Sequence, residues 1–207
     1  MEIAKLQFIT NYLSERSHLE QVKAVVAAGV KWIQYRPKNA NRVDILAEGQ
    51  EIATFCRDHS VTFIMNDFAD IALELNADGV HLGKNDLSPR EARKLLGSRK
   101  IIGGTANTAD DIEHLVSQGV DYVGLGPFRF TKTKQNLSPV IGLEGYDEIV
   151  RELLHRTISV PIVAIGGIRQ ADIGPILNTG VHGIAISSLL SEVAENNENA
   201  KALLKLF

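Results

Sequence analysis

The segment between Asp121 and Gly142 carries the densest group of phosphate-binding residue types in the chain. An apolar run, Tyr122–Leu125, ends in Gly126-Pro127, and the loop that follows contains Arg129, Thr131, Lys132, Thr133 and Lys134. Hydroxyls, cations and backbone N–H groups gathered after a buried strand are suited to gripping phosphate. The alternative is a solvated surface loop that happens to be basic, but the rest of the chain supplies further parts of a phosphate site.

A pair of acidic residues predicts a metal site. Asp67 and Asp86 follow neighbouring predicted strands, so we expect their carboxylates to converge on one point. Two carboxylates with no nearby cysteine or suitably spaced histidine form a hard oxygen site, which suits Mg²⁺. Magnesium with two protein ligands takes its remaining ligands from water and substrate phosphate. Each aspartate has a structural alternative as a helix cap, most plainly Asp67 before the predicted helix Phe68–Leu75.

Cationic residues predicted near these carboxylates indicate that the metal would bind together with a diphosphate. Arg36 and Lys38 stand two residues apart on an extended segment and therefore share a direction. With Lys134, they are the expected catalytic residues, because together they would neutralise a diphosphate that also carries the metal. Gln34 and Asn66 offer amide donors and acceptors suited to the edge of a heterocycle. For Lys38 taken alone, a solvated surface position is the alternative.

Two short motifs late in the chain predict a second anion site. Gly166-Gly167 follows the seventh predicted strand and Ser187-Ser188 follows the eighth. In barrels, the loops after strands seven and eight often form a phosphate cradle, and glycine lets backbone N–H groups approach the anion closely. A lone Gly-Gly pair is also typical of a simple turn, so the combination of the two motifs carries the prediction.

The two anion pockets together indicate a reaction. One pocket has a metal and suits a diphosphate, whereas the other suits a monophosphate. The sequence offers no Ser-His-Asp set and no lysine placed for a Schiff base, and His81 is open between an acid–base role and simple packing. A diphosphate beside Mg²⁺ is a leaving group, so the expected chemistry is substitution at the carbon that bore it. Such a reaction needs positioning and charge stabilisation more than a nucleophilic side chain.

The elements that position these residues alternate regularly along the chain. Near-continuous apolar runs predict strands buried on both faces, and helical patterns such as Glu144–His155, Arg169–Asn178 and Leu189–Leu206 separate them. Eight such units without a linker predict a single α/β domain over residues 1–207, a (β/α)8 TIM barrel, in preference to a doubly wound open sheet. The predicted strands are Leu6–Thr10, Val30–Arg36, Val61–Asn66, Asp78–Gly83, Lys100–Gly104, Val120–Gly126, Val160–Ile165 and Val181–Ser187.

Composition narrows the class of protein. A net charge of −3 provides no basic field for nucleic acid or anionic lipid, so the expected partners are small-molecule substrates, with a homo-oligomer left open. A single cysteine, Cys56, excludes an internal disulfide and a cysteine-built metal site. No cleavage signal or apolar run of membrane-spanning length is evident, so we expect a cytoplasmic protein without membrane contact.

The motifs also resemble a known family. In order, the chain carries QYRPK, MND, ADGVHLGKND, IIGGT, GPFRFTKTK, IGLEGY, VAIGGI and ISS, from about Gln34 to Ser188. This set is similar to the thiamine-phosphate synthase (thiamine-phosphate pyrophosphorylase) family. The resemblance implies a transferase of thiamine biosynthesis. It would join hydroxymethylpyrimidine diphosphate, through a stabilised pyrimidinylmethyl cation, to a thiazole monophosphate, giving thiamine phosphate and diphosphate.

The resemblance also implies a role for each matching residue. Asp67 and Asp86 would bind Mg²⁺, and Lys134 would contact the diphosphate. The pyrimidine substrate would be held by Gln34, Tyr35, Arg36, Pro37, Lys38, Asn66 and Thr105. The thiazole phosphate would be held by Thr131, Lys132, Thr133, Gly167, Ser187 and Ser188.

Two positions depart from the family pattern. Thr105 stands where a serine is usual, which retains the hydroxyl and adds a methyl group, and Asn107 replaces a common histidine. A sister branch, the thiazole tautomerases, uses that histidine for proton transfer, so Asn107 argues against a tautomerase. A sugar-phosphate epimerase and a non-catalytic phosphate-ligand sensor are also compatible with a phosphate-binding barrel. Neither accounts for the combination of Asp67, Asp86 and Lys134.

Overall fold

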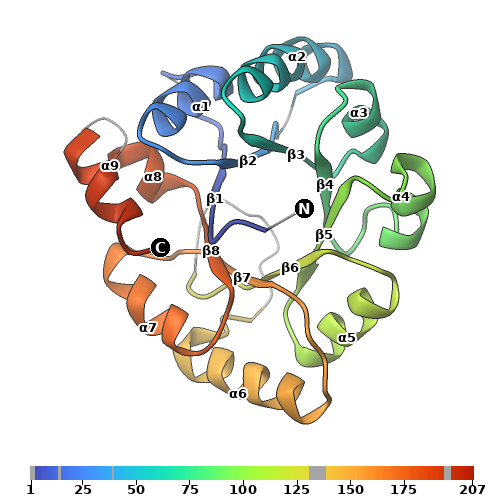
Figure 1. The fold of residues 1–207 in the computed structure, drawn as a ribbon, viewed down its shortest axis with the longest axis vertical. Helices are drawn as coiled ribbons and strands as arrows, with labels where there is room; N and C mark the ends of the chain where they lie inside the picture. The colour runs from blue at the N-terminus through green and yellow to red at the C-terminus, as the bar shows by residue number, and fades with distance from the viewer. Residues whose placement is uncertain (1–2, 14, 39, 131–138, 194–196) are drawn as a thin grey trace.

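The computed structural model describes residues 3–13, 15–38, 40–130, 139–193 and 197–207 (Figure 1). The predicted phosphate-binding residues Thr131, Lys132, Thr133 and Lys134 lie outside these ranges. Across the described part of the chain, none of the helices is both long and apolar enough to cross a membrane.

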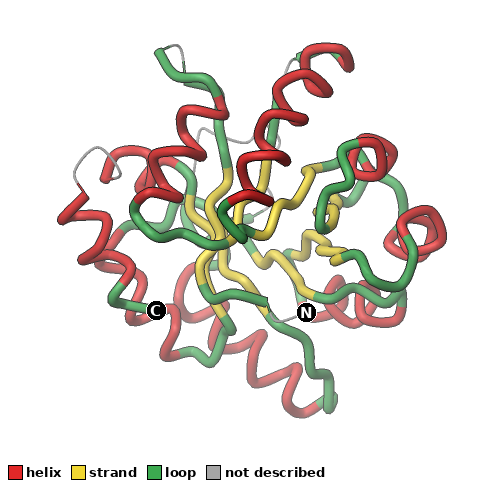
Figure 2. Tube along the Cα trace, turned by 45° about the horizontal axis from the view of Figure 1, so that its top comes forward, coloured by secondary structure: helices red, strands yellow, loops and turns green. Residues whose placement is uncertain are grey.

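The centre of the molecule is a closed barrel of eight parallel strands in sequence order, with β8 paired to β1 (Figures 1 and 2). This confirms the predicted (β/α)8 barrel and excludes the open sheet. The strands are shorter than predicted at most ends. They are β1 (Leu6–Ile9), β2 (Trp32–Tyr35), β3 (Thr62–Asn66), β4 (Gly79–Leu82), β5 (Ile101–Ala106), β6 (Tyr122–Leu125), β7 (Ile162–Ile165) and β8 (Gly183–Ile186).

Helices surround the barrel as an outer layer (Figure 2). The expected helix Arg169–Asn178 starts as a 3₁₀ turn, and the expected helix Leu189–Leu206 is described as two helices on either side of residues 194–196. The helices are α1 (His18–Ala27), α2 (Arg42–Asp58), α3 (Ala69–Glu74), α4 (Pro89–Leu96), α5 (Ala109–Ser117), α6 (Gly142–His155), η1 (Gln170–Asp172), α7 (Ile173–Asn178), α8 (Ser188–Val193) and α9 (Asn197–Leu204).

A glycine–valine pair follows three of the helices, at Gly29-Val30, Gly119-Val120 and Gly180-Val181, and explains why the next strand begins later than predicted. After α1, Gly29 adopts φ 112° and its N–H donates to the Val26 carbonyl, while the Val30 N–H donates to the Val25 carbonyl. This is a Schellman ending, in which the residue after the glycine still satisfies the helix. Val30 is therefore buried and β-branched, but its N–H serves the helix and not the sheet.

The barrel interior is closed at one end by apolar side chains and is polar at the other. Side chains that point inward from alternate strand positions pack into a small core consisting of Ile9, Trp32, Ile64, Ile101, Tyr122, Val163 and Ala185. A larger core fills the layer between strands and helices. Because all strands are parallel, their carboxyl ends meet at one rim, where the residues that follow each strand are brought together.

Candidate functional site

A cavity of about 480 Å³ opens at this rim. It is lined from every strand or from the loop that follows it, and most of the predicted site residues contribute. The predicted residues that line it are Gln34, Arg36, Lys38, Asn66, Asp67, Asp86, Thr105, Gly167, Ser187 and Ser188. The structure therefore brings together ten predicted residues that are scattered along most of the chain.

Asp67 and Asp86 face each other on one side of the cavity. Burial, followed by the charge and hydrogen bond of Asp86, raises the pKa of Asp67 to about 6. The Asp86 carboxylate also accepts a hydrogen bond of 2.6 Å from the Gly83 N–H, which holds it toward the cavity. Within the described residues, no group of three or more His, Cys, Asp or Glu side chains is placed to hold a metal, so these two carboxylates stand as a pair.

The alternative that Asp67 caps a helix is not supported. Helix α3 starts at Ala69 with Phe68 as its N-cap residue, and no side chain makes a capping hydrogen bond there. Asp67 instead adopts φ 66°, a left-handed conformation that is uncommon for a residue other than glycine, asparagine or aspartate. Its N–H donates to the His81 carbonyl over 2.8 Å. The backbone thus aims the Asp67 side chain at Asp86 and away from the helix.

The predicted cations of the second strand lie beside this carboxylate pair. Charges of Arg36 and Lys38 both lower the pKa of Asp67, although less than burial and Asp86 raise it. Burial lowers the pKa of Arg36, and the nearby Asp67 carboxylate partly offsets that effect. The Thr10 hydroxyl accepts a hydrogen bond of 3.0 Å from the Arg36 N–H and fixes the start of the loop. The site therefore holds two carboxylates and two cations at one edge.

Two residues of the QYRPK motif do not line this cavity. The side chain of Tyr35 is fully buried between the barrel and the outer helices, where its hydroxyl donates to Glu48 of α2 over 2.9 Å. Pro37 borders a separate hollow on the outer side, together with Tyr35 and Lys38. Successive side chains of an extended segment point to opposite sides, so only Gln34, Arg36 and Lys38 reach the interior. The prediction that the side chains of Tyr35 and Pro37 hold substrate in this cavity is therefore not supported.

The opposite wall of the cavity is formed by residues that follow β7 and β8. Gly166 and Gly167 have φ of 99° and 69°, and a Cβ atom on Gly167 would lie 2.9 Å from the Arg129 carbonyl oxygen. The close packing and left-handed backbone both require glycine there. The Ser187 Oγ is buried and has no hydrogen-bond partner among the described residues. A buried hydroxyl without a partner is costly, so a ligand atom is expected to complete it.

Arg129, predicted to take part in phosphate binding, is paired with protein groups in the structure. Its guanidinium makes a bidentate ion pair with Asp172, at 2.6 and 3.0 Å, and also donates to the Gly167 carbonyl over 3.2 Å. A guanidinium held in this way has its charge largely balanced by a protein carboxylate. The pair ties the loop after β6 to the turn after β7 and orients Gly167.

Asp172→Asn tests this clamp. We expect a loss of about 1 kcal/mol of unfolding free energy at pH 7, because the ion pair is partly exposed. The Arg129 guanidinium lowers the pKa of Asp172 below its ordinary 3.8, so the contribution is complete above pH 4 and is lost as pH falls through the lowered value. Urea denaturation at pH 7 and at about pH 3 measures both effects. Asp147→Asn, which breaks the exposed pair with Arg151, is the control, and an equal loss in both variants at pH 7 would contradict a special role for Asp172.

Lys84 and Asn107 line the cavity although neither was predicted to hold a ligand, and His81, whose role was left open, lies beside the predicted residue Thr105. Asn107 donates a side-chain hydrogen bond to the Gly126 carbonyl, and the Lys84 ammonium lies 2.7 Å from the Asp111 carboxylate. The His81 Nε2 atom lies 3.0 Å from the Thr105 hydroxyl, which places both at the cavity wall. The available signal was their position, because Lys84 and Asn107 each follow a predicted strand closely.

Comparison with known proteins identifies the family. A model described as thiamine monophosphate synthase matches residues 6–190, which is most of the chain. The chain belongs to the thiamine monophosphate synthase family. Its motifs, its barrel and its cavity all fall within the matched region.

Individual relatives support this family assignment. A thiamine-phosphate synthase of Flavobacterium johnsoniae is 46% identical over 191 residues, covering 92% of this chain and 90% of the relative. The corresponding protein of Bacteroides fragilis is 44% identical over 201 residues, covering 97% and 98%. Among solved structures, a thiamine phosphate pyrophosphorylase from Pyrococcus furiosus superposes with a TM-score of 0.84 at 31% identity, covering 98% of this chain and 94% of that one. This confirms the family resemblance and places the chain among transferases of thiamine biosynthesis.

Proposed function

We propose that this cavity catalyses the Mg²⁺-dependent condensation of 4-amino-2-methyl-5-hydroxymethylpyrimidine diphosphate with 4-methyl-5-(2-hydroxyethyl)thiazole phosphate. The products are thiamine phosphate and diphosphate. The observation that carries the proposal is the Asp67–Asp86 pair beside Arg36 and Lys38, facing a separate recess at Gly167 and Ser187. In the closed strand order, β3 and β4 lie opposite β7 and β8, so the two anion sites are on opposite walls of one cavity.

The residues fit a magnesium ion. Burial and the nearby Asp86 carboxylate raise the pKa of Asp67, which means that the pair favours either a proton or a cation between the two side chains. Oxygen ligands from Asp67 and Asp86, completed by water and a substrate diphosphate, match the preference of Mg²⁺. When bound, the metal would supply positive charge to the diphosphate and make it a better leaving group.

The cations of this wall are proposed to stabilise the diphosphate as it leaves. Arg36 and Lys38 lie within electrostatic reach of Asp67 and so close to the expected diphosphate. Lys134 is proposed to contribute a third cation from the loop after β6. Negative charge grows on the diphosphate as its bond to the pyrimidinylmethyl carbon breaks, so fixed positive charges lower the barrier.

The remaining residues are proposed to orient the two reacting molecules. Gln34, Asn66 and Thr105 line the cavity beside the carboxylate pair and offer hydrogen bonds to a pyrimidine edge. The recess on the opposite wall would hold the thiazole phosphate, so that the thiazole nitrogen faces the carbon that loses diphosphate. The groups proposed to hold this phosphate are Gly167, Ser187 and Ser188, together with Thr131, Lys132 and Thr133 from the loop after β6.

The proposed partners are these small molecules, without nucleic acid, in a cytoplasmic setting. The net charge of −3 fits a protein whose anion binding depends on local clusters. The residues proposed for the site all belong to one chain, so the proposed chemistry requires no residue from a second copy.

The direct test is product formation from both substrates, with and without Mg²⁺. We expect thiamine phosphate and diphosphate in equal amounts when both substrates and Mg²⁺ are present, and a loss of product when the metal is chelated. Chromatography of thiamine phosphate and a coupled assay for diphosphate measure the two products. Isomerisation of a thiazole carboxylate phosphate without the pyrimidine would indicate a tautomerase instead. Tight binding of both ligands without any product would indicate a sensor.

A further inference from the structure

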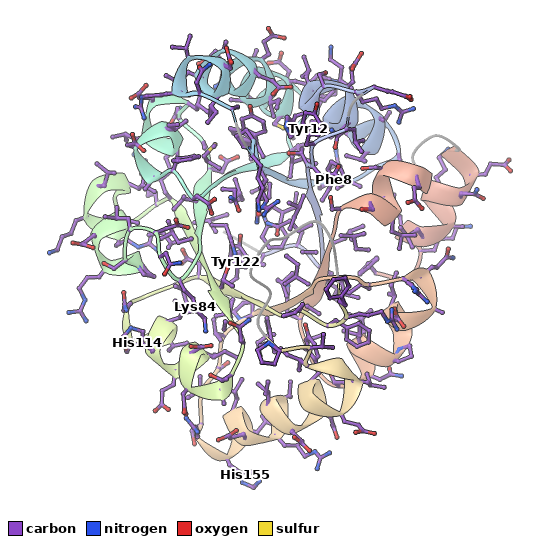
Figure 3. The ribbon with its side chains drawn as sticks, turned by 180° about the vertical axis from the view of Figure 1, so that it is seen from behind. Phe8, Tyr12, Lys84, His114, Tyr122 and His155 are labelled. Atoms are coloured by element: carbon purple, nitrogen blue, oxygen red, sulfur yellow. The ribbon has the colours of Figure 1, made fainter. Side chains whose placement is uncertain are left out.

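A chain of buried side-chain hydrogen bonds crosses the barrel interior beneath the cavity. The Gln34 Nε2 donates to the Gln7 Oε1 over 3.2 Å, and the Gln7 Nε2 donates to the Tyr122 hydroxyl over 3.3 Å. The Tyr122 hydroxyl lies 2.9 Å from the His81 Nδ1, and the His81 Nε2 lies 3.0 Å from the Thr105 Oγ1. The five residues lie on five different strands, which are β1, β2, β4, β5 and β6. Figure 3 shows Tyr122 within the ring of strands.

The Tyr122 hydroxyl determines which atoms donate and which accept in this series of hydrogen bonds. Burial raises the pKa of its hydroxyl, so the group stays neutral and keeps its one hydrogen. The Gln7 amide donates to the Tyr122 oxygen, and its own oxygen accepts from Gln34, so the hydroxyl already acts as an acceptor on this side. The hydroxyl hydrogen is therefore directed to the remaining neighbour, the His81 Nδ1.

The hydrogen bond from Tyr122 also determines which nitrogen of His81 donates to Thr105 at the cavity wall. If Nδ1 accepts a hydrogen bond, a neutral imidazole carries its hydrogen on Nε2. The Nε2–H donates to the Thr105 Oγ1, which fills one acceptor position of that oxygen. The hydrogen of the Thr105 hydroxyl is left to point elsewhere, and Thr105 lines the cavity.

Two glycines make room for the two rings. A Cβ atom on Gly103 would lie 2.2 Å from the Tyr122 ring carbon Cζ, and one on Gly124 would lie 3.0 Å from the His81 Cε1. Gly103 on β5 thus leaves space for the Tyr122 ring, and Gly124 on the neighbouring strand β6 leaves space for the His81 ring. The position of both rings is determined by packing as well as by hydrogen bonds.

We propose that Tyr122 and Gln7 are positioning residues that hold His81 as its Nε2–H tautomer, which makes the Thr105 hydroxyl a donor to the cavity ligand. The ligand then needs an acceptor atom at this point, such as a ring nitrogen. Naming that ligand as the aminopyrimidine rests on the proposed function, but the tautomer itself does not. In this arrangement His81 transmits the direction of a hydrogen bond and has no role as a proton donor to the substrate.

The tautomer can be measured without substrate by ¹⁵N NMR of histidine-labelled protein, with the His81 signals assigned from their loss in His81→Gln. We expect an unprotonated Nδ1 and a protonated Nε2 at neutral pH. Tyr122→Phe removes the donor to Nδ1, so the Nδ1–H form should become populated. Observation of Nδ1–H in the unmodified protein, or an unchanged tautomer in Tyr122→Phe, would overturn the proposal.

Kinetics of the same variants test the consequence for the ligand. In Tyr122→Phe we expect kcat/KM for the pyrimidine substrate to fall roughly 10- to 100-fold, with little change in KM for the thiazole phosphate. Gln7→Met should shift both readouts in the same direction but less, because it retains the Tyr122 hydroxyl. Equal losses for both substrates would indicate a general structural effect and contradict the positioning role.

A second buried tyrosine is a matched control. Tyr146 of α6 is also fully buried, and its hydroxyl donates to the Leu125 carbonyl outside the chain of hydrogen bonds. Tyr146→Phe should lower stability by a similar amount while leaving the His81 tautomer and the substrate preference unchanged. If the tautomer is as stated but no thiamine phosphate forms, the proposed function fails and the positioning inference holds. If thiamine phosphate forms normally but His81 carries its hydrogen on Nδ1, the positioning inference fails and the proposed function holds.

Discussion

Asp67→Asn is expected to abolish Mg²⁺-dependent turnover while stabilising the metal-free fold. The amide is a weaker ligand for a hard cation, so we expect kcat to fall on the order of 10²- to 10³-fold or more. Asparagine tolerates the left-handed backbone that Asp67 adopts at φ 66°, so the local fold should be retained. Removing one of two like charges that lie close together should also relieve repulsion with Asp86.

The pH dependence of stability gives this prediction a second readout. The pKa of Asp67 is raised to about 6 in the native state, above its ordinary value of 3.8, so the native state loses stability as pH rises from about 3.8 through about 6, and the loss is complete above that range. Without metal, the variant should therefore unfold a few degrees higher than the unmodified protein at pH 8, and the difference should shrink toward pH 5. Adding Mg²⁺ should stabilise the unmodified protein and not the variant.

Thermal unfolding with and without Mg²⁺, together with steady-state kinetics, measures both effects. Asp70→Asn is the matched control, because Asp70 lies three residues away on α3 and forms an exposed ion pair with Arg42. That control should retain activity and its response to Mg²⁺. Full activity of Asp67→Asn at low magnesium would contradict the metal assignment.

Gly167→Ala is expected to disrupt the thiazole phosphate site selectively. The added Cβ atom would meet the Arg129 carbonyl oxygen at 2.9 Å, in a backbone conformation with φ 69° that alanine disfavours. The turn must shift, which would displace both the backbone N–H groups of the recess and the Arg129 clamp. We expect KM for the thiazole phosphate to rise roughly 100-fold, with a smaller change for the pyrimidine diphosphate.

Gly174→Ala is the matched control for this substitution. Gly174 lies on α7, in the same strand–helix unit, and an added Cβ atom there meets no atom within 4 Å. Alanine at this position should leave both KM values unchanged. Initial rates with each substrate varied in turn measure the two KM values. A matched rise in both KM values for Gly167→Ala would show that the turn supports the whole cavity and not one recess.

The fold was predictable because its signals are local. Each strand is an apolar run, and helices such as α1 and α5 end in a glycine followed by a valine, so the strand–helix alternation is legible without any distant contact. The boundaries were less accurate, because a buried valine such as Val30 or Val120 resembles a strand residue while its N–H completes the preceding helix. Strand propensity and burial do not distinguish these two uses of the backbone.

Much of the cavity was also predictable, because parallel strands carry their following residues to one rim. Asp67, Asp86 and Ser187 each follow a strand, and the barrel alone brings them together. Tyr35 and Pro37 were included because they share a motif with residues that do line the cavity. The alternation of an extended segment sends them to the outer side.

The amino-acid sequence alone determined the barrel, the family and most of the residues at the rim, since these depend on periodicity and on position after a strand. Only the tertiary structure decided which polar groups are already paired. In the sequence, Arg129 is only a cation in a basic loop, but in the structure it pairs with Asp172, 43 residues away. In the same way, Tyr122 is only part of an apolar strand in the sequence, but in the structure its hydroxyl accepts a hydrogen bond from Gln7, 115 residues away. Hydrogen bonds and ion pairs depend on distances of a few ångströms between distant segments, and no local pattern contains that information.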